Sequence, residues 1–507
     1  MPWTTRKADF GLSRGWGSAG RALPYVLPVT TDLVSHFHAS DLAGDSTYNG
    51  SRALGNFVQQ WTARAGSSLL TFDQLSSDAD VYRPVLMKGR LNGKDYLHFE
   101  GEPNSISSTQ FREITGSLTP YNFIHQTGDF HIFLVVNCLR YGTAGPIFSN
   151  AYTSTQHGIY IAATTTHQVN AYLVNGTGVT MATVTSSGAN LLIPGRWHVI
   201  EVYGSGVTGV LSVSVDGASP NNSAAITVVS ASNATALARI GRNTTNVSTF
   251  NGGIADILIY DNKLSLSNQA SVLTSLQSHY NLTNASVYQP KLIFGLGDSI
   301  IAGSSSNSAF PFIASQQAGS NWMTVNWGWG SGKLLPSAGV EIRDNWNNNI
   351  ETRYAATPGT KNVFLLAGIN DIIAASTASD IWNTATYGLK ALIDEILGTS
   401  GFRLICLNLL PCYAYLDDTL SDAARDAAQI ELDALNDEIS NYCTAQSIPF
   451  IDANFYMRDE DVLNTLSDGG TKGNFTAANP SGTDKLHPNF LGHTYLASQA
   501  ATAAISG

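Results

Sequence analysis

The chain has 507 residues, too many for one ordinary core, so two or more domains are expected. Charged residues make up 13% of it, about half of their usual share, and the formal charge at pH 7 is −11. A chain of this composition has no excess of Lys and Arg from which to form the basic surface that binds nucleic acid or anionic lipid. Neutral glycans and small esters are the partners that it favours.

Residues 1–30 show neither helical nor strand periodicity, and we expect them to form an N-terminal arm. The arm contains GLSRG at 11–15, which has the letters of a nucleophile elbow, but no apolar strand precedes it and no helix follows it. The arm lacks the apolar core of a secretion signal, and no stretch of the chain approaches the length of a membrane span. Together with a composition rich in Ser, Thr, Asn and Gly, this favours an extracellular protein or a virion component released by cell lysis.

Residues 31–287 carry the pattern of an all-β sandwich. Short segments that alternate or run apolar lie between Gly, Asn and Asp turns, as in RWHVIEVYG (196–204), GVLSVSVDG (209–217) and GGIADILIYD (252–261). Such segments predict antiparallel strands. One helix is expected to close the domain over 265–282, with a buried face formed by Leu266, Ala270, Val272, Leu273 and Leu276.

The segments at 194–217 and 237–265 resemble the closing strands of concanavalin A-like, laminin-G-type jelly rolls. The resemblance covers roughly Thr31 to Leu282. It implies a jelly-roll sandwich that either binds glycan or serves as a spacer or assembly unit. Trp61 and Tyr160 are candidates for glycan contacts, with a place in the core as the alternative.

No metal or other cofactor is expected. His36 and His38 alternate on a presumed strand, where a pair of satisfied surface histidines is a better interpretation than a metal site. The GSGK at 330–333 lacks the first glycine and the final Ser or Thr of a phosphate loop. The four cysteines form no C-x-x-C pair, so they indicate neither a zinc site nor a disulfide framework. They are Cys138, Cys406, Cys412 and Cys443.

Residues 288–507 alternate between strand and helix patterns. The apolar segments LIFGL, TVNWG, NVFLLAG, FRLICLNLL and IPFID predict strands, and helical patterns at 380–397 and 422–443 lie between them. This alternation predicts a parallel sheet covered by helices.

Candidate catalytic residues follow the strands of this second part. LIFGLGDSII places Ser299 where a strand must turn, and NVFLLAG runs directly into Ile369 and Asn370. TVNWGWGSGKLL places several glycines after another strand, where a backbone N–H can approach a ligand closely. In GTDKLHP, Asp484 and His487 are spaced so that the carboxylate can meet Nδ1 of the imidazole while Nε2 faces outward.

The order of these four blocks resembles the SGNH (GDSL-type) hydrolase superfamily over about Lys291 to Gly507. The resemblance implies an α/β, flavodoxin-like domain of three layers that needs no cofactor. It also implies that Ser299 is the nucleophile, His487 the general base and Asp484 the carboxylate that orients the base. The implied oxyanion hole consists of the side-chain amide of Asn370, the N–H of Ser299 and the N–H of Gly330 or Gly332, of which Gly332 is preferred.

The expected function is therefore that of a serine esterase that removes acyl groups, acetyl above all, from a polysaccharide. A bacterial surface polysaccharide and a bacteriophage tail or virion-associated deacetylase fit this expectation. A lipase or thioesterase for longer acyl chains, and a structural or receptor-binding virion protein with an inactive hydrolase fold, are the alternatives. A homo-oligomer, or attachment to a larger particle through residues 1–30, remains open, while nucleic acid binding and membrane insertion are not expected.

Overall fold

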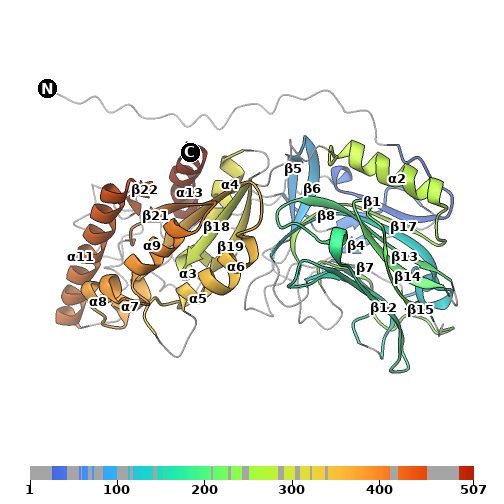
Figure 1. The fold of residues 1–507 in the computed structure, drawn as a ribbon, viewed down its shortest axis with the longest axis horizontal. Helices are drawn as coiled ribbons and strands as arrows, with labels where there is room; N and C mark the ends of the chain where they lie inside the picture. The colour runs from blue at the N-terminus through green and yellow to red at the C-terminus, as the bar shows by residue number, and fades with distance from the viewer. Residues whose placement is uncertain are drawn as a thin grey trace.

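The computed structural model describes residues 26–42, 56–58, 60–66, 71–73, 84–99, 112–114, 118–140, 145–153, 155–206, 209–226, 230–242, 250–283, 291–302, 309–319, 322–336, 341–410, 421–453 and 490–506. They form a β-sandwich and an α/β domain that lie side by side (Figure 1). Of the expected N-terminal arm, residues 1–25 lie outside the described residues. No helix among the described residues is long and apolar enough to cross a membrane.

The described strands of the sandwich form two antiparallel sheets. The larger has nine strands in the order β15-β14-β13-β8-β17-β6-β5-β2, with β1 also paired to β17. Its strands are β1 (Leu33–His38), β2 (Asn56–Phe57), β5 (Val85–Leu91), β6 (Lys94–Phe99), β8 (Asp129–Arg140), β13 (Trp197–Ser205), β14 (Val210–Val215), β15 (Asn221–Ala225) and β17 (Asn251–Tyr260). The predicted strands at 196–204, 209–217 and 252–261 are thus confirmed as β13, β14 and β17.

The second sheet has eight strands in the order β12-β11-β10-β9-β16-β7-β4-β3. They are β3 (Gln60–Thr62), β4 (Thr71–Asp73), β7 (Arg112–Ile114), β9 (Gly145–Ser149), β10 (His157–Ala163), β11 (Val169–Asn175), β12 (Thr180–Thr185) and β16 (Arg239–Ile240). Short helices at η1 (Ala39–Asp41), α1 (Phe123–Gln126) and η3 (Gly188–Asn190) join strands of the sandwich. The predicted jelly-roll sandwich is confirmed.

The nine-stranded sheet is buried on both faces. On β8, Ile132 and Leu134 point into the core between the two sheets, whereas Phe133 and Val135 belong to a second apolar cluster on the opposite face. Side chains alternate between the faces of a strand, so a strand that is apolar at every position must be covered on both sides. The helix α2 (Leu266–His279) and the α/β domain provide this cover (Figure 1).

The closing helix begins as the sequence predicts and packs differently. Ser265 is its N-cap and accepts a hydrogen bond from the N–H of Asn268 at 3.3 Å. Val272 and Leu276 are buried as predicted. The prediction was wrong for Leu266, which is 81% exposed, and for Ala270, which is exposed. Both lie on the outward side of the helix.

Two histidines and two aromatic residues that the sequence singled out lie in the interior of the sandwich. His36 and His38 are buried and not on the surface, because β1 pairs with β17 inside the sheet. His36 Nε2 lies 2.7 Å from a carboxylate oxygen of Asp256. Trp61 and Tyr160 are also buried, so the alternative that they are packed inside the domain holds.

The α/β domain contains a five-stranded parallel sheet in the order β19-β18-β20-β21-β22. The five strands coincide with the five predicted segments: β18 (Lys291–Gly297), β19 (Trp322–Gly328), β20 (Thr360–Leu366), β21 (Phe402–Leu407) and β22 (Phe450–Ile451). In chain order this is the 2-1-3-4-5 arrangement of flavodoxin-like folds, as predicted.

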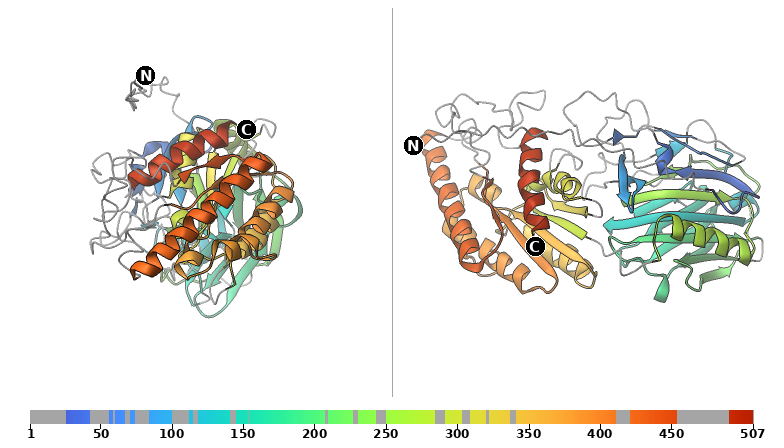
Figure 2. Two further views of the ribbon diagram at one scale, coloured as in Figure 1. Left: turned by 90° about the vertical axis from the view of Figure 1, so that its left-hand side faces the viewer. Right: turned by 90° about the horizontal axis from the view of Figure 1, so that it is seen from above.

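Helices flank this sheet on both faces (Figure 2). They are α3 (Ser299–Ala302), α4 (Phe310–Gln317), α5 (Ile342–Asn345), the π-helical turn η5 (Trp346–Glu351), α6 (Thr352–Tyr354), α7 (Ile369–Ile373), α8 (Ala378–Asn383), α9 (Leu389–Gly398), α11 (Asp422–Gln446) and α13 (Phe490–Ile505). The single helix predicted at 380–397 is divided into α8 and α9. The break falls at residues 384–388, where two threonines and a glycine disfavour helix.

The two domains share one apolar cluster and several specific contacts. Leu91 and Phe133 of the sandwich belong to the same cluster of buried side chains as Phe294 and Trp346 of the α/β domain. The guanidinium of Arg90 donates to two backbone carbonyls at the C-terminal end of α4, that of Gln316 in its last turn and that of Gly319 just after it. The hydroxyl of Tyr354 donates to the carbonyl of Leu139 on β8.

Candidate active site

Ser299 is the first residue of α3 and follows strand β18 after one residue. Two glycines allow the backbone to come this close to its neighbours. A Cβ on Gly297 would lie 1.9 Å from the carbonyl oxygen of Leu366 on β20, and a Cβ on Gly328 would lie 2.1 Å from the N of Ala302. Glycine at these positions therefore lets α3 sit directly on the carboxyl edge of the sheet.

Asp298, between Gly297 and Ser299, is fully buried. One carboxylate oxygen accepts the N–H of Ile300 at 2.9 Å, and the other has no partner among the described residues. Burial raises the pKa of Asp298 to about 7; the nearby Asp371 adds to the shift, while the bond from Ile300 opposes it. The nucleophile candidate is thus preceded by a carboxyl group that titrates near neutral pH.

Asn370 lies in the first turn of α7, at the end of the neighbouring strand β20. Its side-chain amide donates one hydrogen bond to the carbonyl oxygen of Gly332 at 3.0 Å. A carboxamide carries two N–H donors, so one remains for a ligand at the strand edge. Asn370 is partly exposed, as a residue that contacts a substrate must be.

The loop after β19 contains a tight turn at residues 329–332. The N–H of Gly332 donates to the carbonyl of Trp329 at 3.0 Å, and Ser331 has φ +60°. Gly330 does not have a positive φ, so the turn is of type II, with Ser331 at the position where glycine is usual. A serine held in this conformation costs about 1 kcal/mol or more.

This turn bears on which backbone N–H can receive an oxyanion. Gly332 is buried and its N–H already donates within the turn. Gly330 and Ser331 are exposed at the apex, and their N–H groups donate to no group in the described part of the chain. Of the two predicted glycines, the geometry therefore favours Gly330. The geometry also makes the N–H of Ser331 a candidate donor. The sequence does not predict this, because no local pattern indicates that a serine will adopt a positive φ.

The structure thus brings Ser299, Asn370, Gly330 and Gly332 to the same edge of the parallel sheet, as the sequence predicted for strand ends. Asp484 and His487 lie outside the described residues, so their pairing with Ser299 stays a prediction. Among the residues that the structure does describe, no group of three or more His, Cys, Asp or Glu is placed to hold a metal ion.

The sequence of this domain matches a known family. Residues 296–495 match the model of the GDSL-like lipase/acylhydrolase family. The C-terminal domain is a GDSL-like hydrolase domain. Residues 117–268, in the sandwich, match the concanavalin A-like lectin/glucanases superfamily. The match of the GDSL-like domain supports esterase- or lipase-type hydrolysis of carboxylic esters.

Several solved structures are similar to parts of the chain, and no curated protein matches it. A member of the lipolytic protein G-D-S-L family from Veillonella parvula DSM 2008 is 20% identical over 42% of this chain and 97% of its own, with a TM-score of 0.30. The M. Smegmatis aryl esterase is 15% identical over 43% of this chain and 99% of its own, with a TM-score of 0.31. The binding domain of Botulinum Neurotoxin DC, solved in complex with SialylT, is 10% identical over 49% of this chain and 52% of its own, with a TM-score of 0.32.

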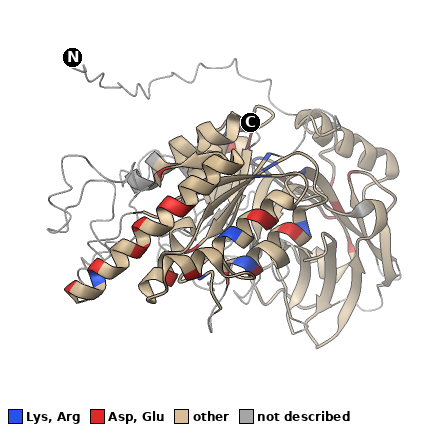
Figure 3. Ribbon diagram, turned by 60° about the vertical axis from the view of Figure 1, so that its left-hand side comes forward, with Lys and Arg blue, Asp and Glu red and all other residues tan. Residues whose placement is uncertain are grey.

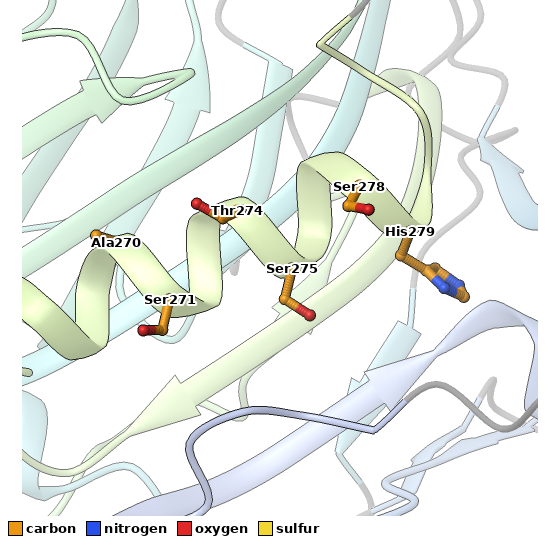
Figure 4. Close-up of a pocket in the computed structure, with 6 residues that line it drawn as sticks. All are labelled: Ala270, Ser271, Thr274, Ser275, Ser278 and His279. Carbon is orange, nitrogen blue, oxygen red and sulfur yellow. The ribbon is translucent and has the colours of Figure 1, made fainter.

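A separate hollow lies on the exposed side of α2, the helix that packs on the sandwich. Its volume is about 690 Å³. The lining side chains are small and mostly hydroxylic, as Figure 4 shows: Ala270, Ser271, Thr274, Ser275, Ser278 and His279. Burial and the charge of Lys94 lower the pKa of His279 to about 4, and its Nε2 lies 3.3 Å from that of His38. None of the described lining residues is acidic, so this lining offers no carboxylate to orient His279 as the base of a triad.

Proposed function

We propose that the chain is a serine esterase that removes acetyl groups from a polysaccharide. Ser299 is the nucleophile, His487 the general base and Asp484 the carboxylate that orients the base. The observation that supports this most directly is the contact between two strand ends, where Asn370 donates to Gly332 beside the helix that begins at Ser299. A nucleophile, a carboxamide donor and exposed backbone N–H groups at one sheet edge are what acyl transfer requires.

The proposed reaction has two halves. His487 takes the proton of the Ser299 hydroxyl while the oxygen attacks the ester carbonyl, whose oxygen becomes an anion. Asn370 and the N–H groups at the apex of the 329–332 turn donate to this anion. The intermediate collapses, the sugar oxygen leaves with the proton from His487, and the acetyl group stays on Ser299. Water then attacks in the same way and releases acetate.

A polysaccharide substrate rests on the composition of the chain and on the companion domain. The sandwich belongs to a superfamily of lectins and glucanases, and charged residues are few in the whole chain. In the GDSL-like domain, many of the ribbon positions coloured for Asp, Glu, Lys or Arg belong to the helices α9 and α11 (Figure 3). A neutral acetylated glycan suits a chain with so few charged residues better than a charged ligand does.

The experiment is to measure acetate release from acetylated bacterial surface and plant polysaccharides by the full chain. The control is Ser299→Ala, which should lower the rate at least about a thousandfold while the protein stays folded. His487→Ala should lower it equally, and the double variant should be little worse than either single one, because the two residues act as a unit. Additive losses of rate in the double variant would show that His487 and Ser299 do not act together.

The acyl chain decides between this proposal and its alternatives. A deacetylase should hydrolyse acetyl esters of a chromogenic alcohol faster than octanoyl or palmitoyl esters, whereas a lipase or thioesterase should show the reverse order. If the full chain hydrolyses these esters no faster than Ser299→Ala does, the domain is an inactive hydrolase fold.

A further inference from the structure

Asp371, the residue after Asn370, anchors the loop that contains the 329–332 turn. Its two carboxylate oxygens accept the N–H groups of Leu334 and Leu335, each at 3.0 Å. Asp371 is 1% exposed and Leu334 is fully buried, so the bond to Leu334 is shielded from water, while the bond to Leu335 is partly buried. Hydrogen bonds from backbone N–H to a carboxylate are among the stronger kind in proteins.

The loop is fixed at its other end as well. The N–H of Trp329 donates to the carbonyl of Gly297, two residues before Ser299, at 3.0 Å. Between the two ends, Asn370 donates to the carbonyl of Gly332. Residues 329–335 are therefore tied to the end of β18 on one side and to the first turn of α7 on the other.

The three sets of hydrogen bonds constrain different parts of the loop. The bond from the N–H of Trp329 fixes only the start of the loop. The bond to the carbonyl of Gly332 comes from the side chain of Asn370, which itself turns about its χ angles. Asp371 holds two consecutive backbone N–H groups at once and so fixes the direction of the chain as it leaves the turn. Burial raises the pKa of Asp371, while the two N–H groups and the charge of Lys333 oppose the rise.

We propose that Asp371 is a positioning residue for the esterase reaction: it holds the 329–332 turn so that the exposed N–H groups of Gly330 and Ser331 and the amide of Asn370 converge on one oxyanion. This inference rests on the proposed esterase activity. A donor displaced by about 1 Å loses much of its effect on a charge that develops only in the transition state. Asp371 acts through the loop and does not touch the substrate.

The test is Asp371→Asn in the full chain. The carboxamide keeps the size of the side chain, but it has one oxygen in place of two and presents an NH₂ group to one of the two backbone N–H groups. We expect kcat for a small acetyl ester to fall about ten- to a hundredfold with KM nearly unchanged. Hydrogen exchange followed by mass spectrometry should show faster exchange in peptides that cover 329–336, and unchanged exchange in β20.

Asp216→Asn is the matched control. Asp216 also accepts a backbone N–H, that of Val199 at 2.9 Å, and also contacts a second donor, His198 Nδ1 at 2.8 Å, but it lies in the sandwich. This variant should be less stable and keep the kcat of the wild type. A substitution that destabilises the protein in a general way would lower the melting temperature of both variants and spare kcat in both.

The outcomes separate the two proposals. If the wild type hydrolyses the ester and Asp371→Asn matches its kcat, the positioning role is overturned and the esterase stands. The same holds if exchange of the loop rises without loss of kcat. If the wild type hydrolyses no ester, the proposed function fails and the positioning role fails with it, whatever the exchange of the loop.

Discussion

The side-chain amide of Asn370 and the carbonyl oxygen of Gly332 are joined by a hydrogen bond of 3.0 Å, although 38 positions separate them in the chain. The bond connects the ends of two strands, β19 and β20, that flank β18 on opposite sides. Asn370 is thus both a candidate oxyanion donor and a support for the loop that carries the other donors.

This double role predicts the behaviour of Asn370→Ala. Loss of the donor should lower kcat by roughly 10²–10³, about 3–4 kcal/mol, with little change in KM, because the donor acts on charge that develops in the transition state. Steady-state kinetics on an acetyl ester measures both constants. A rise in KM with kcat intact would instead make Asn370 a substrate-binding residue.

The backbone donor can be located with substitutions at Gly330. Gly330→Pro fits the second position of a type II turn and removes one N–H, whereas Gly330→Ala keeps the N–H and adds a Cβ that meets nothing within 4 Å. If Gly330 is the donor, the proline variant should lose about 10²-fold in kcat relative to the alanine variant. Equal kcat values would show that the N–H of Gly330 is not a donor and would leave that of Ser331 as the donor from this turn.

Ser331→Gly provides the complementary measurement. Glycine keeps the N–H and adopts a positive φ without strain. The variant should therefore keep kcat, gain about 1 kcal/mol in its free energy of unfolding and unfold at a slightly higher temperature. A loss of kcat in this variant would mean that the hydroxyl of Ser331, and not its backbone, contacts the substrate.

Asp298 predicts a decrease of stability with rising pH. Its pKa in the folded protein is about 7, raised from an ordinary value of 3.8, so between these pH values the folded state holds a proton that the unfolded state has released. The free energy of unfolding should therefore fall as pH rises from about 4 to about 7, by up to about 4 kcal/mol for this group.

Asp298→Asn cannot titrate and should lack this component. The difference in unfolding free energy between variant and wild type, measured in urea at several pH values from 4 to 8, should grow in favour of the variant as pH rises. A difference that stays constant over this range would show that Asp298 keeps an ordinary pKa.

His98 predicts a dependence of the opposite sign. It is 2% exposed on β6, stacks on Phe312 of α4 at 5.2 Å, and its ring nitrogens have no partner among the described residues. Burial lowers its pKa to about 4, so below about 6.5 the unfolded state takes up a proton that the folded state refuses. Stability should fall as pH drops from about 6.5 to about 4.

His98→Leu should remove this loss in acid and should be close to neutral in stability at pH 7, because a buried ring without hydrogen bonds is replaced by an apolar side chain of similar size. Thermal unfolding of variant and wild type at pH 4.5 and pH 7 measures both effects. Equal losses in the two proteins at pH 4.5 would place the acid-sensitive group elsewhere.

Much of the architecture follows from periodicity alone. The five strands of the parallel sheet are continuous apolar segments because each is covered on both faces, and the residues that follow them meet at one edge by the geometry of the sheet. Ser299 and Asn370 could therefore be placed together from the sequence. The family match agrees with the blocks that place them.

Other features depend on contacts between distant segments. Nothing near His36 indicates burial, which arises from the pairing of β1 with β17 and from Asp256, 220 residues away. The choice between Gly330 and Gly332 depends on which N–H closes a turn, and this is a property of the folded loop. The exposure of Leu266 likewise reflects where the helix meets the sheet.

The shared apolar cluster beneath β8 sets a limit on how this protein can be recombined. A fusion of independent modules joins two closed surfaces by a linker, and either module can be exchanged for a homologue. Here Phe133 and Leu91 of one half lie in the same interior as Phe294 and Trp346 of the other, and Arg90 caps the helix that follows Ser299 in the chain. A chimera that takes its hydrolase from another parent must therefore inherit the matching outer face of the nine-stranded sheet as well.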